Sequence, residues 1–278
     1  MIMEKKVVII TGASSGMGKE AALLLLQDHW TVYACARRTG EMTEIAGKGG
    51  NIVPLDVTDE ASMVSCVNTV LEKEGQIDVL VNNAGYGSCG SIEEIPMEEV
   101  RNQYEVNVFG LGRMTQLVLP AMRRQRSGRI VNISSMGGRF TTPYGGWYHS
   151  TKYAVESISD ALRMEVRPWN IEVVLVEPGM IQTNWGVIAA GNIRKFSGNG
   201  AYAAEASKAS EYYETHYNPS SGDLTSPAVV GRTIYKACVV ANPKTRYRIG
   251  RYAVLLTTLK KYLSDNMFQS IVRRSMGL

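Results

Sequence analysis

A tyrosine and a lysine four residues apart are the first pair of side chains in the sequence that could do chemistry together. Tyr148 and Lys152 bound the run YHSTK, inside a segment with helical periodicity. Positions four apart on a helix share a face, so we expect the ammonium of Lys152 near the phenol of Tyr148. A free phenol has a pKa of about 10, and nearby positive charge lowers that pKa toward the range useful for proton transfer. Because many helices contain this spacing by chance, the pair gains weight only from its partners.

A serine and an asparagine are the expected partners of this pair. Ser135 stands 13 residues before Tyr148, directly after the strand-like run RIVNIS over residues 129–134. Its hydroxyl could donate a hydrogen bond to a substrate oxygen and stabilise charge that develops there. Ser134 is the alternative, but the spacing and the direction of the strand end favour Ser135. Asn107 lies in the middle of a predicted helix, where an asparagine by itself indicates packing or a kink.

A glycine-rich turn, TGASSGMG over residues 11–18, follows the first predicted strand and begins the first predicted helix. Without side chains, its backbone N–H groups and the positive end of the helix could bind a pyrophosphate. The strand–turn–helix setting favours this function over the alternative, a tight structural turn. The residues assigned to the phosphate site are Gly12, Ser14, Ser15, Gly16, Met17 and Gly18.

The end of the second predicted strand indicates which dinucleotide would bind. An NAD site places Asp or Glu there to bind the ribose hydroxyls, whereas an arginine accommodates the 2′-phosphate of NADP. This chain has Ala36 at the acidic position, followed by Arg37 and Arg38. Because an arginine is permanently charged and offers a planar fork of donors, we predict NADP (NADPH), with NAD as the alternative. A less specific interpretation takes both arginines as solvated loop residues.

Short β-branched runs alternate with segments of helical period along most of the chain. The runs are continuously apolar, as expected of strands in a sheet that is covered on both faces. The alternation predicts a single α/β domain over residues 1–278, doubly wound and of the Rossmann type, with helices on both faces of a mostly parallel seven-stranded sheet. The predicted strands cover residues 7–11, 31–36, 51–55, 79–82, 129–134, 171–176 and 246–249, and the predicted helices residues 18–27, 60–73, 98–124, 148–166 and 227–241.

Two segments depart from this alternation. Residues 185–225 are rich in Gly, Ser and aromatic residues and lack clean strand patterns. Ligands of open α/β sheets bind beyond the carboxyl ends of the strands, so this insertion after the sixth strand is placed to cover a substrate. Residues 252–278 form a predicted helical extension with an apolar face. Because its cationic residues are few, packing of that face on the domain is favoured over contact with a membrane surface.

Composition excludes several other classes of protein. The 30 Lys and Arg and the 26 Asp and Glu give a net charge of +4 without a basic block, so no nucleic-acid partner is expected. The apolar run Ala21–Leu26 is far shorter than the roughly 18 residues of a membrane span, and no signal peptide is apparent. The histidines show no ligand spacing and the cysteines no C-x-x-C pair, so we expect no metal site, no disulfide framework and a reducing, cytoplasmic location. The cysteines stand far apart in the sequence, at Cys35, Cys66, Cys89 and Cys238.

Four motifs occur in an order that resembles the short-chain dehydrogenase/reductase family. They are TGxxxGxG at residues 11–18, NNAG at 82–85, YxxxK at 148–152 and PGxxxT at 178–183. The resemblance implies that Asp56 binds the adenine amine, that residues 83–85 lie against the adenine ribose, and that residues 178–183 fix the nicotinamide carboxamide. Lys152 would also bind a ribose, and Asn107 would hold a water that links Lys152 to solvent. The cofactor residues it implies beyond the glycine turn and the arginines are Asp56, Val57, Asn83, Ala84, Gly85, Tyr148, Lys152, Pro178, Gly179, Met180 and Thr183.

The same resemblance implies an oxidoreductase that uses NADP to interconvert a secondary alcohol and a ketone. Tyr148 would exchange a proton with the substrate oxygen during hydride transfer, Ser135 would position that oxygen, and Lys152 would tune Tyr148. The chain around residues 83–95 and the tail are similar to the hydroxysteroid and retinol dehydrogenase branch, so a bulky hydrophobic ketone or alcohol is expected. Family members commonly form a homodimer or homotetramer through a self-complementary contact.

Two functions of other classes remain open from the sequence. One is a non-enzymatic NADP-binding regulator on the same fold, since a fold does not fix a function. The other is a sugar-nucleotide epimerase or dehydratase, which shares the YxxxK motif. The regulator is disfavoured because the catalytic set is whole, and the epimerase because it usually carries a different glycine spacing and a larger carboxyl-terminal domain.

Overall fold

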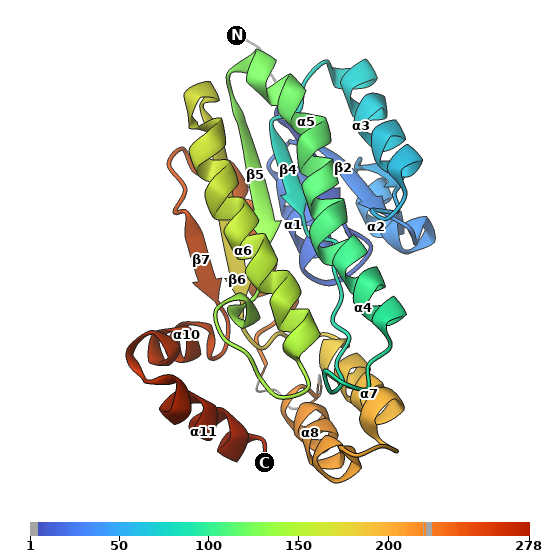
Figure 1. Cartoon of the computed structure of the whole chain (residues 1–278). Coiled ribbons are helices and arrows are strands. Elements are labelled where there is room, and N and C mark those ends of the chain that lie inside the picture. The colour runs from blue at the N-terminus through green and yellow to red at the C-terminus, as the bar shows by residue number, and fades with distance from the viewer. Residues whose placement is uncertain (1–4, 219, 221–223) are drawn as a thin grey trace.

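Seven strands form one parallel sheet in the computed structural model, which describes residues 5–218, 220 and 224–278. Their order across the sheet is β3-β2-β1-β4-β5-β6-β7, and every neighbouring pair is parallel. The carboxyl ends of the strands point to the lower side of Figure 1. The strands are β1 (Val7–Thr11), β2 (Thr31–Ala36), β3 (Asn51–Pro54), β4 (Val79–Asn82), β5 (Gly128–Ile133), β6 (Ile171–Pro178) and β7 (Arg246–Ile249).

Helices cover both faces of this sheet (Figure 1), which confirms the predicted doubly wound α/β fold of the Rossmann type. Four of the five residues of β1 are apolar, and all five are buried between the two helical layers. The first layer holds α1 (Gly16–Gln27) and α9 (Pro227–Val239), and the second holds α3 (Glu60–Glu74), α4 (Met97–Tyr104), α5 (Leu111–Gln125) and α6 (Gly146–Val166).

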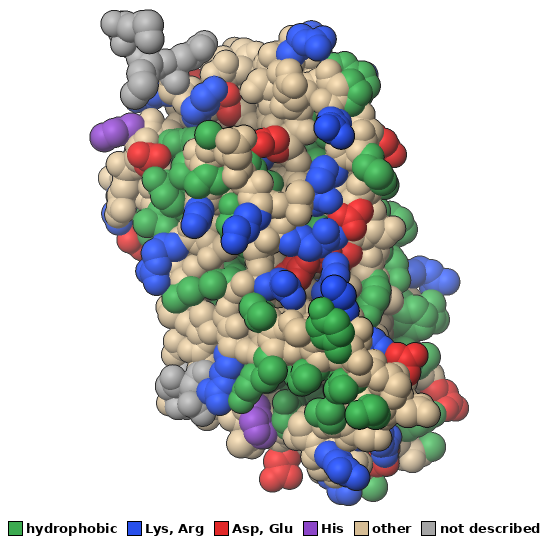
Figure 2. Space-filling model, turned by 90° about the vertical axis from the view of Figure 1, so that its left-hand side faces the viewer, with side chains coloured by type: hydrophobic (Ala, Val, Ile, Leu, Met, Phe, Trp, Pro, Cys, Tyr) green, Lys and Arg blue, Asp and Glu red, His purple; other side chains and the backbone are tan. Residues whose placement is uncertain are grey.

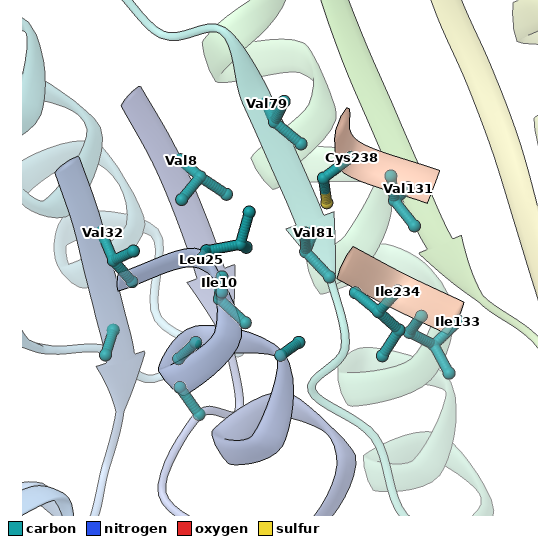
Figure 3. Close-up of a cluster of buried hydrophobic side chains, with 14 of the residues drawn as sticks. Val8, Ile10, Leu25, Val32, Val79, Val81, Val131, Ile133, Ile234 and Cys238 are labelled. Atoms are coloured by element: carbon teal, nitrogen blue, oxygen red, sulfur yellow. The ribbon is translucent and has the colours of Figure 1, made fainter. Parts of the chain in front are cut away.

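The core under the first layer is made of small and branched side chains (Figure 3). The parallel register sets Val8 of β1 opposite Val79 of β4. Leu25 of α1 and Ile234 of α9 are fully buried in the same cluster. This packing holds β1 and β4 side by side at the point where the strand order reverses, which is where ligands of such sheets bind.

A buried polar chain ties the carboxyl ends of β4 and β5 together. The Asn82 side-chain amide donates to the Asn132 amide oxygen over 2.9 Å and to the Thr115 hydroxyl over 3.1 Å. The Asn132 amide in turn donates to the Ser159 hydroxyl of α6 over 2.9 Å. Because buried donors are costly to leave unpaired, these bonds fix the strand ends that carry the residues discussed below.

The helix predicted over residues 98–124 is wrong in one respect, because it is not continuous. A π-helical turn, η2 (Glu105–Gly110), separates α4 from α5. Such a turn widens the helix and redirects the side chains within it, and π turns are frequent at functional sites. Between β2 and β3 the chain also forms two short helices that the sequence pattern does not predict, η1 (Thr39–Met42) and α2 (Thr43–Gly47).

The two atypical segments are helical. Helices α7 (Trp185–Ser197) and α8 (Ala203–His216) occupy most of the predicted insertion, of which residues 219 and 221–223 lie outside the described residues. The tail forms two helices, α10 (Ala253–Tyr262) and α11 (Asp265–Ser275), and the hydroxyl of Ser264 between them accepts the Met267 N–H over 3.4 Å. All four helices lie at the carboxyl end of the sheet (Figure 1). Across the described residues, no helix has the length and apolarity that crossing a bilayer needs.

The four cysteines are buried thiols. Although they stand far apart in the sequence, the fold brings the sulfur atoms of Cys35 and Cys66 to 3.5 Å from each other. Buried thiols of this kind pack as small hydrophobic side chains.

Candidate active site

A long cleft of about 740 Å³ opens at the carboxyl ends of β1 and β4. The strand order reverses there, as it does at the ligand sites of other open α/β sheets. The fold thus brings residues from five separate loops to one place. The predicted site residues that line the cleft are Gly12, Ser14, Ser15, Gly16, Met17, Arg37, Arg38, Asp56, Val57, Asn83, Ala84, Gly85 and Thr183.

The glycine turn has a backbone that needs glycine. Gly12 and Gly16 have φ values of +66° and +58°, in the left-handed region that other residues rarely adopt. Gly18 does not line the cleft; a Cβ there would collide with the side chain of Asn83. The Asn83 amide donates to the carbonyls of Thr11 and Gly12 over 3.0 Å each, so it holds the shape of the turn.

Two arginines stand at the rim of the cleft beyond β2. The Arg37 guanidinium is 74% exposed and lies 3.9 Å from the Asp56 carboxylate. Arg38 donates to the Ser14 hydroxyl over 3.4 Å and lies 3.2 Å from the Glu41 carboxylate. Both cations line the cleft, and the last residue of β2 is Ala36 and not an acid.

Asp56 is partly engaged in the turn that follows β3. One of its carboxylate oxygens accepts the backbone N–H and the hydroxyl of Thr58, over 3.0 and 2.8 Å. Asp56 and Val57 both line the cleft, and the second carboxylate oxygen is the one nearest to Arg37. The aspartate thus serves as a turn residue and leaves one oxygen for a ligand.

A smaller cavity of about 150 Å³ adjoins the cleft and contains Tyr148, Ser135 and Lys152 in its wall. The Ser135 hydroxyl hydrogen-bonds with the Tyr148 phenol and accepts the Gly137 N–H over 3.0 Å. Ser134 also lines this cavity, but its buried hydroxyl has no partner among the described residues. The geometry therefore pairs Tyr148 with Ser135 rather than with Ser134.

Burial raises the pKa of Tyr148 to about 12, although the hydrogen bond with Ser135 opposes the rise. The protein without a cofactor therefore does not have the lowered Tyr148 pKa that the sequence suggests. Lys152 Nζ lies 6.0 Å from the centre of the Tyr148 ring and donates to the Ile133 carbonyl over 3.0 Å. Burial lowers the pKa of Lys152 itself to about 8. A phenol with this pKa keeps its proton near neutral pH, and its transfer to a substrate oxygen needs nearby positive charge that stabilises the phenolate.

Asn107 lies in the π turn and is almost fully buried. Its amide oxygen accepts the Tyr86 N–H over 3.0 Å, while its amide nitrogen donates to the Tyr86 carbonyl over 2.8 Å and to the Thr151 hydroxyl over 3.1 Å. A Cβ on Gly85 would lie 3.1 Å from the Asn107 oxygen and 3.7 Å from Lys152 Nζ. Asn107 thus ties the loop after β4 to α6, beside Lys152.

Three of the four predicted residues around the end of β6 line the inner cavity. Pro178, Gly179 and Thr183 line the inner cavity. Met180 does not, because its backbone pairs with Arg251 of the tail and its side chain is buried in the cluster under α7 and α8. Ile181, which follows it, lines the cavity instead.

An aromatic wall closes the inner cavity. Trp185 of α7 packs against Tyr148 with ring centres 5.3 Å apart, and against Tyr213 and Tyr217 at 5.7 and 5.3 Å. The indole N–H of Trp185 is buried without a partner among the described residues and lies where the cleft and the cavity meet. The aromatic content of residues 185–217 predicts such a wall in general terms, but only the tertiary fold selects these three rings.

His149 holds the loop that forms another wall of the cavity. Its Nδ1 lies 2.9 Å from the Gly137 carbonyl and its Nε2 lies 2.9 Å from the Thr142 hydroxyl. Since a carbonyl only accepts, Nδ1 carries the proton and Nε2 accepts from Thr142. Burial lowers the pKa of His149 to about 4, so the ring is neutral near pH 7. These bonds favour a structural role over a proton shuttle.

Two buried carboxylates lie next to cavity residues in the chain, Glu156 one helical turn after Lys152 and Glu177 directly before Pro178. Arg246 Nε lies 3.1 Å from both Glu156 and Glu177. Glu177 is fully buried, and burial together with the charge of Glu156 raises its pKa to about 7. A carboxyl group whose pKa is higher in the folded than in the unfolded chain stabilises the fold at low pH and loses that contribution as the pH rises.

We expect Glu177→Gln to remove a loss of stability that the wild type shows as the pH rises from about 4.5 to about 7. Since one pKa unit corresponds to about 1.4 kcal/mol, this loss is of the order of 3 kcal/mol. Urea unfolding of both proteins across this pH range measures it, with the exposed Glu165→Gln as the matched control. Parallel stability curves for wild type and Glu177→Gln would contradict the assignment.

The residues of the cleft fit a nicotinamide dinucleotide. The turn has two glycines with positive φ, and Ser15 before α1 makes no side-chain bond to the first N–H groups of that helix. Those N–H groups suit a pyrophosphate, and the two arginines at the rim suit a further phosphate. Among the described residues, no group of three or more His, Cys, Asp or Glu side chains is arranged to hold a metal ion.

The fold and the cleft together define a dinucleotide-binding oxidoreductase of the α/β class, and comparisons with known proteins give the family. The family model for short chain dehydrogenases matches residues 6–188. A 3-ketodihydrosphingosine reductase from Bacteroides thetaiotaomicron is 38% identical over 273 residues, 98% of this chain and 98% of that protein. An NADPH-dependent 3-dehydrocapnine reductase from Ornithobacterium rhinotracheale is 34% identical over 280 residues, 96% of each chain.

A solved structure agrees with these relatives. A short-chain dehydrogenase from Streptomyces avermitilis has a TM-score of 0.81 and 33% identity, and the match covers 99% of this chain and 100% of that one. The chain therefore belongs to the short-chain dehydrogenase/reductase family, as the sequence motifs predict, and is an oxidoreductase. None of these comparisons favours a non-enzymatic regulator or a sugar-nucleotide epimerase.

Proposed function

We propose that the protein is an NADPH-dependent reductase that converts the ketone of a long-chain hydrophobic substrate into a secondary alcohol. The observation that carries this proposal is the meeting of Tyr148, Ser135 and Lys152 in a cavity that adjoins the cleft for the dinucleotide. In the direction of reduction an acid must deliver a proton to oxygen, and the Tyr148 phenol carries one near neutral pH.

Arg37 and Arg38 support NADPH over NADH. They offer two permanent cations at the end of β2, where an NADH site would need a carboxylate. One of the relatives is itself named as NADPH-dependent. When bound, the nicotinamide supplies the hydride for the carbonyl carbon.

Each residue of the inner cavity has one task in this scheme. Tyr148 donates its phenolic proton to the substrate oxygen, and the Ser135 hydroxyl binds the same oxygen as negative charge develops on it. Lys152, held by the Ile133 carbonyl, stabilises the negative charge that the departing proton leaves on the phenol oxygen. Asn107 fixes the loop beside Lys152 and supports the path by which the proton is replenished.

The cavity favours a slender hydrophobic chain next to the ketone. Its volume of about 150 Å³ is below the roughly 300 Å³ that drug-sized ligands fill, and Trp185, Tyr213 and Tyr217 narrow it. Two relatives are named as reductases of 3-ketodihydrosphingosine and 3-dehydrocapnine. We therefore favour a long-chain ketone over the steroid-like or polycyclic one that the hydroxysteroid and retinol branch would suggest.

A series of ketones with NADPH tests the substrate class. From acetone-sized to long-chain members, kcat/KM is expected to rise by about fourfold for each methylene that the cavity buries, until it is full. Steroid ketones serve as the bulky comparison, and NADPH oxidation is the readout. A flat series, or one that favours small polar ketones, would overturn the hydrophobic substrate, and preference for the steroid would overturn the slender chain.

We further propose that the protein forms a homodimer or homotetramer. Phe109 of the π turn is 57% exposed, and Ile158 and Met164 of α6 are 38% and 73% exposed. Exposed apolar side chains gathered on the helices that such proteins use for pairing support a two-fold contact between copies.

A further inference from the structure

The two C-terminal helices pack on the domain with one face. Phe268 and Val272 of α11 are buried, as is Ala253 of α10. Phe268 meets Phe140 edge to face with ring centres 5.4 Å apart, and Phe140 lines the inner cavity. The predicted packing of the tail on the domain thus accounts for one face of these helices and also joins the tail to the substrate cavity.

A second face of the same helices is apolar and exposed. On α10, Val254, Leu255 and Tyr262 are 53%, 53% and 73% exposed, and their helical spacing puts them on one side. On α11, Met267 and Ile271 are four residues apart and are 56% and 41% exposed. Figure 2 shows hydrophobic side chains gathered over the lower part of this side of the molecule, where the tail lies, with basic and some acidic side chains around them. We call these five side chains the tail surface.

The charges around the tail surface are mostly positive. Residues 251–278 contain five arginines and lysines but one acidic residue, Asp265, which pairs with Lys260. Lys261 and Arg274 have no carboxylate partner among the described residues. Lys261 lies seven residues after Val254, and Arg274 seven after Met267, so helical geometry puts each cation on the exposed apolar side of its helix.

We propose that the tail surface docks on an anionic lipid bilayer. An apolar face bordered by free cations has the pattern of a helix that lies in the membrane interface, with its apolar side chains at the acyl boundary and its ammonium and guanidinium groups at anionic headgroups. The inference does not depend on the proposed reductase activity. If both hold, docking brings the substrate cavity close to the layer in which a hydrophobic ketone dissolves, since Phe268 joins the tail to that cavity.

Vesicle sedimentation of the whole protein tests this proposal. We expect binding to vesicles of equal parts phosphatidylglycerol and phosphatidylcholine, weaker binding to pure phosphatidylcholine, and release by salt. Lys261→Gln and Arg274→Gln should each weaken binding to the anionic vesicles by about fivefold. Met267→Glu should abolish most of it, whereas Met97→Glu, the same change at a 48% exposed methionine of α4, should not. An unchanged thermal unfolding midpoint shows that each variant is folded.

Three results would overturn the proposal. One is equal weak binding to both kinds of vesicle, and another is equal loss in Met97→Glu and Met267→Glu. The third is an oligomer in sedimentation velocity that Met267→Glu, but not Met97→Glu, dissociates, because the tail surface would then be a contact between copies of this chain.

Discussion

Tyr148→Phe is expected to lower kcat for ketone reduction by about 10²–10⁴-fold, the usual contribution of a positioned proton donor. The change removes only the phenolic oxygen, which hydrogen-bonds with Ser135 in the inner cavity. The ring remains, and with it the contact to Trp185 at 5.3 Å, so the fold and the cleft should persist. Steady-state kinetics with NADPH measure the loss, and a binding titration of NADPH should give nearly the wild-type Kd.

Tyr153→Phe is the matched control for this experiment. Tyr153 lies on the same helix, five residues further on, and is 42% exposed, so its hydroxyl should have little effect on kcat. Retention of more than about a tenth of kcat in Tyr148→Phe would contradict the role of the phenol as the proton donor. Equal loss in both variants would point to damage of α6 instead.

The sheet and its helices follow from local patterns in the sequence. β1, β2, β4 and β7 have the predicted bounds, and the other strands differ from the prediction by at most two residues at an end. β1, β2, β4 and β6 are recognisable because they are almost entirely buried, so that most of their length must be apolar. The edge strands β3 and β7 are partly exposed. The glycine turn and the YxxxK pair are equally local, because a turn or one helix face fixes the spacing of their residues.

Features set by contacts between distant segments could not be predicted in this way. The π turn interrupts a helix whose residues have ordinary helical periodicity, and the bonds from Asn107 to Tyr86 and Thr151 that accompany it cross between three elements. Met180 turns away from the cavity because its N–H donates to the carbonyl of Arg251, which belongs to the tail. No pattern within the PGxxxT motif carries that information.

The solvent exposure of Tyr148 and Lys152 also depends on segments that are distant in the sequence. Proximity to Lys152 predicts a lowered pKa for Tyr148, yet enclosure by aromatic rings from α7 and α8 raises it. Desolvation acts on both groups, so Lys152 has a weaker hold on its own proton than a lysine in water. The spacing of the two residues gives their distance but not the solvent around them, which depends on a segment more than thirty residues away.

Substitution of Arg37 is expected to change the preference of the enzyme for NADPH over NADH. Arg37→Ala is expected to lower kcat/KM for NADPH by about 10–100-fold, because a hydrogen bond to a charged group contributes about 1.5–3 kcal/mol. For NADH, which lacks the 2′-phosphate, kcat/KM should change by less than about threefold. Arg124→Ala, at an exposed arginine in the last turn of α5 far along the chain from the cleft, is the matched control.

Arg37 should matter more than Arg38, and the structure gives the reason. Arg38 is already bonded to Ser14 over 3.4 Å and to Glu41 over 3.2 Å, so a phosphate must compete with a carboxylate for it. Arg37 is 74% exposed, and its one ion pair within the described part of the chain is a 3.9 Å contact with Asp56, so it can turn to a phosphate at little cost. Arg38→Ala is therefore expected to lower kcat/KM for NADPH by a smaller factor than Arg37→Ala does. Two results would show that the two arginines are solvated loop residues. One is a higher kcat/KM of the wild type for NADH than for NADPH, and the other is an equal loss of kcat/KM with both cofactors in Arg37→Ala.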